Sequence, residues 1–339
     1  MTGDRPVATG GSRRVTIVDV ADLSGVSRQT VTRAMNDMSG ISADTKQRVL
    51  AAAQQLGYRP SRFGRGLVRR DHQTLGLVID NLMNPYYPEL ASAVVARAAE
   101  RGWTVLLLDC SGVDDQRAML VRVADQIDAV IGYVVVDRQE LDVTLPGVPV
   151  VRIDPRRPGP GLNRVEYDFR PGMADVVEHL LERGSRHPVM LDSSASGADL
   201  SERAQFFARA MKKRGLDVPV VHADGEQVEV GFRATEELIT TFPDTDAIMC
   251  FNDIMAFGAL KALRQHHRDV PGDVAVIGVD GLVAGTYVTP QLTSLSLDMT
   301  QVAELAVDIA LGRLDGSIAS GSRPAKRKIR HRLLIRESS

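Results

Sequence analysis

A chain of 339 residues is too long for one ordinary domain and suggests two or three. With 44% apolar and 25% charged residues it has the composition of a globular protein, and no apolar run reaches the roughly 18 residues that a membrane span needs. The net charge of −2 conceals an asymmetry, because residues 1–70 hold twelve Lys and Arg against five Asp, whereas the remainder holds 29 basic and 38 acidic residues. We call residues 1–70 the head and the remainder the body. A basic head on an acidic body indicates that only the head contacts the phosphate groups of a nucleic acid.

The cysteines and the N-terminus indicate a reducing compartment. Cys110 and Cys250 end separate apolar runs, which favours buried thiols over a disulfide, and no metal-ligand spacing involves them. The first dozen residues lack the apolar stretch of a signal peptide, and we expect residues 1–14 to be a disordered tail. The sequence therefore predicts a cytoplasmic protein with no metal and no other cofactor.

Residues 16–36 predict two short helices joined by a tight turn. Thr16 is a suitable N-cap, and Asp19 is placed to complete a capping box. Gly25 supplies the left-handed residue that ends the first helix, and Ser27 can cap the second. The inward-facing positions are expected to be Ile17, Val20, Ala21 and Leu23 on the first helix and Val31, Ala34 and Met35 on the second.

The outward face of the second helix carries Arg28, Gln29, Thr32 and Arg33. Arg and Gln are the side chains that can read guanine and adenine edges with two hydrogen bonds each in the major groove. For the arginines alone, a solvated basic surface is an equally good interpretation. Together with the caps, the glycine turn and the spacing, they favour a DNA-recognition helix.

A third helix is predicted from Ser42 to Leu56, ending at Gly57 with Pro60 beyond it, so residues 15–60 form a helix-turn-helix domain. The basic stretch 61–71 that follows contains three large apolar residues and two glycines. A plain linker is the alternative, but a hinge segment that folds on DNA explains the apolar residues better.

From Thr74 the pattern alternates between strands and helices, which predicts an α/β body of two doubly wound parallel-sheet lobes. A bridge rich in Pro and Gly, Pro155–Gly161, separates the two sets. The expected strands are 75–79, 104–108, 129–136, 148–153, 189–191, 218–222, 247–251, 274–279 and a terminal strand over 328–336. The expected helices are 85–101, 115–127, 172–183, 200–214, 230–242, 254–266 and 299–314. Because the last helix and strand follow the second set, we assign 72–165 with 295–323 to the first lobe, and 166–294 with 324–339 to the second.

Polar residues follow many of these strands, at the edge where open parallel sheets bind ligands. They are Asp80, Asn81, Asn84, Asp109, Asp154, Asp192, Ser193, Ser194, Asn252, Asp253 and Asp280. Capping of the next helix is an equally good explanation for each of them, most clearly for Asn84 and Asn252. If the lobes face each other, a carboxylate-rich cleft joined by Arg203 suits a ligand with many hydroxyls or amines. No P-loop, nucleophile elbow or histidine cluster indicates catalysis.

With these residues in place, the chain resembles the lactose-repressor/galactose-repressor (LacI/GalR) family of bacterial transcription regulators from Val15 onward. The motifs that carry the resemblance are Val15-Thr-Ile-x-Asp-Val-Ala, Gly25-Val-Ser-x-Gln-Thr-Val-x-Arg, Leu56-Gly-Tyr-x-Pro60, Asn84-Pro-Tyr-Tyr, Phe251-Asn-Asp-x-Met-Ala-x-Gly-Ala, Val276-Ile-Gly-Val-Asp280, Thr289-Pro-x-Leu-Thr293 and Leu334-Ile-Arg-Glu-Ser338.

The resemblance implies a homodimer that binds a near-palindromic double-stranded operator, with pairing of dimers into a tetramer left open. It implies a periplasmic-binding-protein-like body that binds a small-molecule effector, a sugar or another polyhydroxylated metabolite. Leu67 falls on the family's leucine that wedges into the minor groove. The implied DNA-binding residues are Thr16, Ser27, Arg28, Gln29, Thr30, Thr32, Arg33, Asn36, Tyr58, Arg62 and Leu67. The implied effector-binding residues are Asp80, Asn84, Tyr86, Asp154, Arg203, Asn252 and Asp280.

The chain departs from the family pattern at four positions. Gly64 and Gly66 replace helix formers in the hinge, at a cost of roughly 1 kcal/mol each in helix propensity, which predicts a hinge easily released from DNA. Phe206 replaces a usual glycine beside Arg203, and Gly281 replaces a second acid. We expect both to alter the cleft.

Three classes of function compete. A ligand-controlled repressor, in which lobe closure changes the population of a DNA-competent hinge, explains both the head and the body. A sugar-binding transport protein is disfavoured by the basic head and the missing signal peptide. An enzyme is disfavoured because no acid/base or nucleophile set is evident.

Overall fold

The structure, a computed structural model, describes residues 16–35, 38–56, 73–154, 161–193, 200–319 and 322–339. The chain divides into two compact units, Met1–His72 and Gln73–Ser339. The predicted tail 1–14 and hinge 61–71 lie outside the described residues. So do the following predicted positions: Asn36, Tyr58, Arg62, Gly64, Gly66, Leu67 and Ser194.

The head is the predicted three-helix domain, with α1 (Ile17–Ser24), α2 (Arg28–Met35) and α3 (Ala43–Gln55). Its centre is formed by Val20, Val31 and Val49, one from each helix, all fully buried. Gly25 ends α1 in the left-handed region, at φ 66°, as the turn requires. The expected inward position of Leu23 is wrong: its side chain is 47% exposed, and Ser24, four residues after Val20 on the same helix face, is buried.

The body contains two six-stranded sheets with the same order of strands. The first has the order β11-β5-β4-β3-β1-β2 and the second β12-β10-β9-β8-β6-β7. The first comprises β1 (Thr74–Ile79), β2 (Thr104–Asp109), β3 (Ala129–Gly132), β4 (Val150–Ile153), β5 (Asn163–Asp168) and β11 (Lys326–Arg330). The second comprises β6 (Pro188–Ser193), β7 (Val220–Ala223), β8 (Ala247–Cys250), β9 (Ala275–Asp280), β10 (Thr293–Ser296) and β12 (Arg332–Leu334). All neighbours are parallel except β10 and β12.

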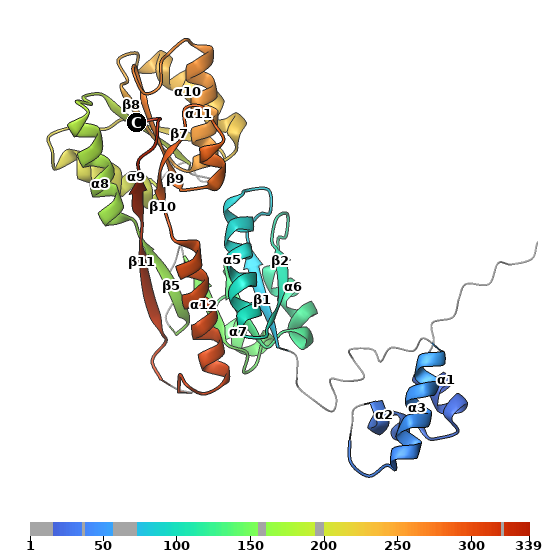
Figure 1. The fold of residues 1–339 in the computed structure, drawn as a ribbon. Coiled ribbons are helices and arrows are strands. Elements are labelled where there is room, and N and C mark those ends of the chain that lie inside the picture. Colours follow the sequence, from blue (N-terminus) through green and yellow to red (C-terminus); the bar gives the residue numbers. More distant parts are fainter. Residues whose placement is uncertain (1–15, 36–37, 57–72, 155–160, 194–199, 320–321) are drawn as a thin grey trace, which may run out of the picture. The chain divides into compact units, whose positions relative to one another are not determined.

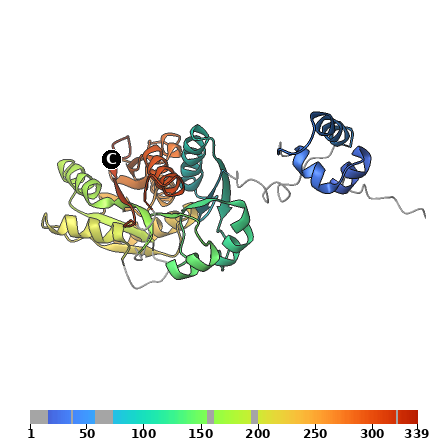
Figure 2. The same cartoon turned by 90° about the horizontal axis from the view of Figure 1, so that it is seen from below.

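Each sheet is covered on both faces, as a doubly wound sheet requires. In the first lobe, α5 (Tyr86–Glu100) and α12 (Met299–Leu314) lie side by side on one face (Figures 1 and 2), and α6 (Gln116–Val123) and α7 (Arg138–Thr144) cover the other. In the second lobe, α8 (Phe169–Glu182) and α9 (Glu202–Lys212) cover one face, while α10 (Val228–Thr241) and α11 (Asp253–Gln265) cover the other. Short 3-10 turns lie at Ala124–Gln126 and Val283–Thr286.

The packing of α10 against α11 depends on two glycines. A Cβ built on Gly231 would lie 2.3 Å from the carbonyl oxygen of Met255, and one on Gly258 would lie 2.1 Å from that of Val228. Both contacts are with backbone atoms, which cannot move aside as a flexible side chain can. The two helices therefore approach more closely than any side chain at either position would allow.

Three predicted features of the body need correction. The helix α7 and the strands β5 and β10 were not predicted, and β3 ends at Gly132 rather than at residue 136. The single terminal strand expected over 328–336 is two strands, β11 and β12. Because β11 pairs with β5 in the first sheet, the assignment of all of 324–339 to the second lobe is wrong for residues 326–330. The lobe bounds are also wrong for residues 166–168, which belong to β5 of the first sheet, and for residues 295–296, which belong to β10 of the second.

The chain passes between the two sheets at three places. β5 ends at Asp168 and α8 begins at the next residue; β10 ends at Ser296 shortly before α12; and only His331 separates β11 from β12. The passages are neighbours, because Asp168 pairs with Arg330 and Ser296 pairs with Arg332.

Two further expectations concern chemistry and membranes. Cys110 and Cys250 are free, and burial raises the pKa of both thiols. Within the described ranges, no group of three or more His, Cys, Asp or Glu side chains is placed to hold a metal ion. None of the helices in those ranges is long and apolar enough to cross a membrane.

Candidate functional site

The exposed face of α2 presents the predicted DNA-reading side chains. Arg28 and Gln29 are both exposed in the first turn of the helix. Arg33, one turn later, is half-buried, and its guanidinium lies beside Gly40, where an added Cβ would be 3.2 Å from Nη1. The first turn of α2 thus offers one cation and one amide to a partner, as readout of base edges in a major groove requires.

The predicted hydroxyl contacts take part in helix capping. The Ser27 hydroxyl accepts a hydrogen bond from the N–H of Thr30 at 3.2 Å, and the two side-chain oxygens are 3.0 Å apart. The Thr32 hydroxyl donates to the carbonyl of Arg28. At the start of α1, both the N–H and the hydroxyl of Thr16 donate to Asp19 at 2.7 Å, which confirms the reach of Asp19 back to the cap. The contacts of Thr16 and Ser27 fix the starts of the two helices, whereas the Thr32 bond lies within α2.

In the body, the fourth strand of each sheet ends in an aspartate with unusual backbone geometry. Asp154 follows β4 with φ 42°, and Asp280 ends β9 with φ 119°. Non-glycine residues seldom adopt positive φ, and such strain is retained where the surrounding structure fixes it, often at functional sites. The equivalent positions of the two carboxylates indicate a shared role at the strand ends.

Three tyrosines of the first lobe form a hydrogen-bonded cluster. The hydroxyl of Tyr86 lies 2.7 Å from that of Tyr167, and the Tyr133 hydroxyl donates to Tyr86 at 2.7 Å. Burial, followed mainly by the charge of a neighbouring tyrosine, raises the pKa of Tyr86 and Tyr133, and the carboxylate of Asp154 adds to both shifts. Burial and then Asp154 raise the pKa of Tyr167. All three hydroxyls therefore stay protonated and can both donate and accept hydrogen bonds.

Arg203 on α9 is held in the second lobe by aromatic and polar contacts. Its guanidinium lies 4.3 Å from the ring centroid of Phe251 and 5.2 Å from that of Phe169. Nη1 donates to the carbonyl of Phe251 at 2.5 Å, and Nη2 lies 3.7 Å from the Asp280 carboxylate. A guanidinium held in this way keeps its planar donor fork in a fixed orientation.

These groups form one network, which we name the strand-end cluster: Tyr86, Tyr133, Asp154, Tyr167, Arg203 and Asp280. Burial raises the pKa of Asp280 to about 7, Arg203 opposes the rise, and Glu226, Asp154 and Glu89 add to it. The charges of Asp154 and Asp280 also raise the pKa of Tyr167. Carboxylates, neutral hydroxyls and one oriented guanidinium thus meet at aromatic walls, a set that can bind a polyhydroxylated ligand.

The other predicted strand-end residues lie at the margin of the cluster or support it. Asn252 accepts from the N–H of Met255 at 2.8 Å as the cap of α11, and its amide donates to the Glu226 carbonyl at 3.5 Å. Asn84 accepts from the Tyr86 N–H at 3.1 Å. Asn252 therefore caps α11, the alternative that the sequence left open, whereas the cap position of α5 is Pro85 and Asn84 precedes it. Asp80, which is exposed, accepts from the Tyr87 hydroxyl at 3.4 Å.

Two buried aspartates have structural partners. Asp192 accepts from the N–H and hydroxyl of Ser201, at the start of α9. Asp253 accepts from the Ser294 hydroxyl at 2.5 Å and from the Leu282 N–H at 2.7 Å. Burial and the charge of Asp280 raise the pKa of Asp253. These contacts join the loops under the cluster to the second sheet.

Several residues of this region were missed by sequence reasoning. They are Glu89, Tyr133, Tyr167, Phe169, Glu226, Phe251 and His331. Tyr167 lies in the unpredicted strand β5, and His331 lies between two strands predicted as one. The Phe169 ring stacks on His331 with centroids 3.9 Å apart, and Glu89 accepts from the Val283 N–H at 2.9 Å across the lobes. Of these residues, Phe251 was the one that the sequence could have indicated, because it ends the predicted strand 247–251 and directly precedes Asn252.

The structure explains one of the departures from the family pattern, at Gly281, and corrects the expectation for another, at Phe206. Gly281 has φ 72°, and an added Cβ would lie 2.3 Å from Cβ of Ser296, so no acidic side chain fits without displacing the backbone. Phe206, expected to alter the cleft, instead lines a groove between α8 and α9 together with Arg170 and Arg209. On α9 it lies about one helical turn after Arg203, but the long Arg203 side chain reaches Phe251 and Asp280, whereas the Phe206 ring lines the groove.

Stability should depend on pH through the buried carboxylates. Because folded Asp280 keeps its proton up to about pH 7, the unfolding free energy falls as pH rises through its titration, and Asp253 acts with the same sign. Burial lowers the pKa of His331 to about 3, so this residue changes the unfolding free energy in the opposite direction. It does so only below about pH 6.5, which is the pKa of histidine in the unfolded chain. We therefore expect the stability of the body to fall from pH ~4 to ~7, and more steeply above pH ~6.5, where His331 no longer opposes the two carboxyls.

Urea unfolding followed by the fluorescence of Trp103, the single tryptophan, tests this expectation. Asp280→Asn removes one of the two titrating carboxylates and should reduce the slope of unfolding free energy against pH. A slope of unchanged size in the variant would contradict the assignment.

Two family models match the chain. Residues 16–61 match the bacterial regulatory proteins of the lacI family, and residues 177–339 match a periplasmic binding protein-like domain. Among curated proteins, the ribose operon repressor of Escherichia coli K12 is 29% identical over 311 residues, covering 88% of this chain and 93% of that protein. The repressor PurR of Photobacterium profundum is 28% identical, covering 88% and 92%.

Solved structures show the same similarity. A LacI family transcriptional regulator from Arthrobacter sp. FB24 in complex with lactose is 32% identical, covers 78% of this chain and 98% of its own, and has a TM-score of 0.73. The regulator CelR in complex with cellobiose is 27% identical over 96% of this chain and 100% of its own, with a TM-score of 0.68. The operator-bound lac repressor dimer, 24% identical over 96% and 99% with a TM-score of 0.77, shows the same fold.

Proposed function

Because the chain belongs to the LacI family of bacterial regulatory proteins, we propose that it is a repressor whose operator binding is controlled by a polyhydroxylated effector at the strand-end cluster. It is a DNA-binding transcriptional regulator and not an enzyme. The family acts as dimers on operator DNA. We place its action in the cytoplasm, where the DNA lies.

The head supports operator binding through α2. Arg28 and Gln29 are exposed side by side in its first turn, and Arg33 follows one turn later. The caps at Thr16 and Ser27 hold the N-termini of α1 and α2, whose free N–H groups suit backbone phosphates. In this proposal Arg28, Gln29 and Arg33 read bases, whereas the capping hydroxyls orient the helices. Asn36, Tyr58, Arg62 and Leu67 remain assigned to DNA by resemblance alone.

The observation that carries the effector site is that Asp280 of the second lobe lies 3.7 Å from Arg203, while the charge of Asp154 in the first lobe helps to raise the pKa of Asp280. A ligand that binds these groups from both lobes at once would stabilise the arrangement of the lobes in which the groups are close together. Tyr86 offers a neutral hydroxyl between them, while Asp80, Asn84 and Asn252 form the margin.

The chemistry of the site favours a neutral ligand with several hydroxyls. The carboxyl groups of Asp154 and Asp280 can accept hydrogen bonds from hydroxyl groups, protonated Asp280 can also donate one, and the aromatic rings give flat walls. A phosphate dianion would be repelled by the carboxylates of the site. The guanidinium of Arg203, which could attract it, already lies near Asp280. The lactose and cellobiose complexes of the similar regulators agree with this choice.

A thermal-shift screen of the full chain against sugars, polyols, nucleosides and amino acids tests the proposal, because a ligand at 100 times its Kd stabilises by about 2.7 kcal/mol. A stabilising sugar or polyol that also changes operator affinity is the expected result. Nucleosides or amino acids as the only stabilising ligands would overturn the polyhydroxylated class.

The variant Arg203→Lys should lower the affinity for that effector by about 10- to 100-fold, because lysine keeps the charge but loses the planar fork and its stacking on Phe251. Isothermal titration calorimetry measures the change. Arg233→Lys, an exposed position on α10, is the matched control and should bind as the wild type does. Equal affinity in both variants would remove Arg203 from the effector site.

A further inference from the structure

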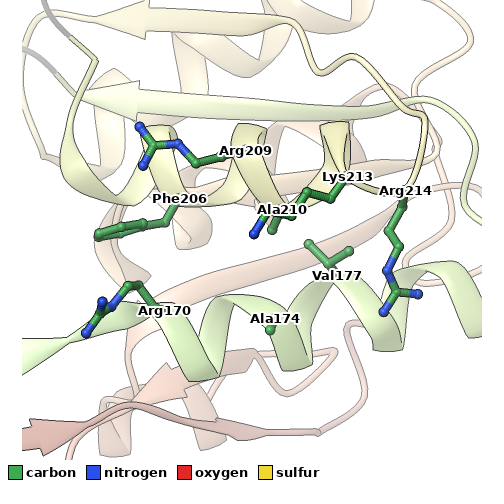
Figure 3. Close-up of a pocket in the computed structure, with 8 residues that line it drawn as sticks. All are labelled: Arg170, Ala174, Val177, Phe206, Arg209, Ala210, Lys213 and Arg214. Atoms are coloured by element: carbon green, nitrogen blue, oxygen red, sulfur yellow. The ribbon is translucent and has the colours of Figure 1, made fainter.

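A groove between α8 and α9 on the second lobe is unexplained by the effector site. Its volume is about 360 Å³, within the range of small-molecule sites. The lining residues are Arg170, Ala174, Val177, Phe206, Arg209, Ala210, Lys213 and Arg214, which come from α8, from α9 and from the two residues that follow α9 (Figure 3). None of them belongs to the strand-end cluster.

The charges of the groove do not cancel. Arg170 is paired with Asp168 at 2.8 Å, and Arg214 is paired with Glu178 at 2.5 Å. Within the described part of the chain, no ion pair or hydrogen bond engages the side chains of Arg209 and Lys213, which are both exposed, the first in the last turn of α9 and the second directly after its last residue. An anion in the groove would therefore find two available cations.

The floor of the groove is apolar. Val177 is almost fully buried, Ala174 and Ala210 are small, and the ring of Phe206 lies beside them (Figure 3). Small side chains leave room for a flat group, and an aromatic ring offers it an edge or a face. Inorganic phosphate would use the cations but leave this floor uncovered.

We propose that this groove is a second ligand site, for an organic anion that carries a carboxylate or phosphate on a flat apolar body. Arg209 and Lys213 bind the anionic group, and Phe206 with Val177 packs against the body of the ligand. Charge complementarity selects an anion, and the volume of the groove selects a small molecule over a protein segment.

Calorimetric titration of the full chain with phenyl phosphate and with benzoate tests the proposal, with benzyl alcohol and inorganic phosphate as partial ligands. We expect saturable binding of both aromatic anions and weaker binding of either partial ligand. The double variant Arg209→Gln with Lys213→Gln should lower the affinity for both aromatic anions about tenfold or more. The variant Phe206→Leu should lower the affinity for phenyl phosphate more than the affinity for inorganic phosphate.

Lys212→Gln is the matched control, since it removes a cation from the same helix one residue away but outside the groove. Its affinity for phenyl phosphate should equal that of the wild type. Three results would overturn the proposal: no saturable binding of either aromatic anion, an equal loss in the control and the double variant, or tighter competition by an oligoglutamate peptide, which would make the groove a protein-binding surface.

Discussion

Replacing Arg28 and Gln29 together with alanine is expected to lower the affinity for the operator about a hundredfold or more. Both side chains are exposed in the first turn of α2, and each bidentate contact to a base is worth about 1–3 kcal/mol. Binding to unrelated DNA should change little, because only one of the two residues is charged. The specific affinity should thus fall towards the non-specific level.

The measurement is fluorescence anisotropy at one fixed salt concentration, on an operator first selected from random DNA by the wild-type chain. Gln47→Ala with Arg48→Ala is the matched control, because it removes the same two residue types from an exposed surface of α3. Similar losses in both double variants would indicate a general electrostatic effect and remove α2 as the reading helix.

Replacing Gly258 with alanine is expected to lower the unfolding free energy of the body by about 2–3 kcal/mol. Alanine is the better helix former by about 1 kcal/mol, so propensity alone predicts the opposite sign. The added Cβ would lie 2.1 Å from the Val228 carbonyl oxygen and 2.5 Å from the Phe232 nitrogen. Both are backbone atoms, so α10 and α11 must separate and lose packing along their length.

Urea unfolding monitored by circular dichroism measures this loss. Gly312→Ala on α12 is the matched control, since the same change in a helix meets only the side chains of Ile318 and Ser317, at 3.0 Å. These side chains can move, and the expected change is within about 1 kcal/mol. A Gly258 variant as stable as the wild type would contradict the close contact of the two helices.

Periodicity and turn residues predicted most of the fold. The head was predicted element by element because its caps and its glycine turn are local signals, and the Gly25 turn has the backbone angle expected of it. The buried strands of the body are short apolar runs, which a sequence displays directly. Strand β5 was missed because its residues are mostly polar and only Val165 among them is buried. Strand β11, with Ile329 alone buried, gave the same weak signal.

The candidate site was predicted only in part, for a different reason. Asp154 and Asp280 could be named because they follow predicted strands. The aromatic partners of Arg203 come from α8 and from the end of β8, and the tyrosines come from three separate segments. Such proximity depends on the way the chain returns between the lobes, which periodicity does not encode. Phe206 shows the converse error, because its place one helical turn after Arg203 suggested that it lines the same cleft, whereas its ring lines the groove between α8 and α9.

The three short passages between the sheets limit how the lobes can move. At most two residues lie in each, and a residue spans no more than about 3.6 Å, so the lobes cannot slide or draw apart by more than a few ångströms. Since Asp168, Arg330, Ser296 and Arg332 pair side by side, the passages act as one pivot, and rotation about it is the motion left open. An effector at the strand-end cluster can therefore influence the head only by changing the angle between the two lobes. A ligand of a different width would set a different angle.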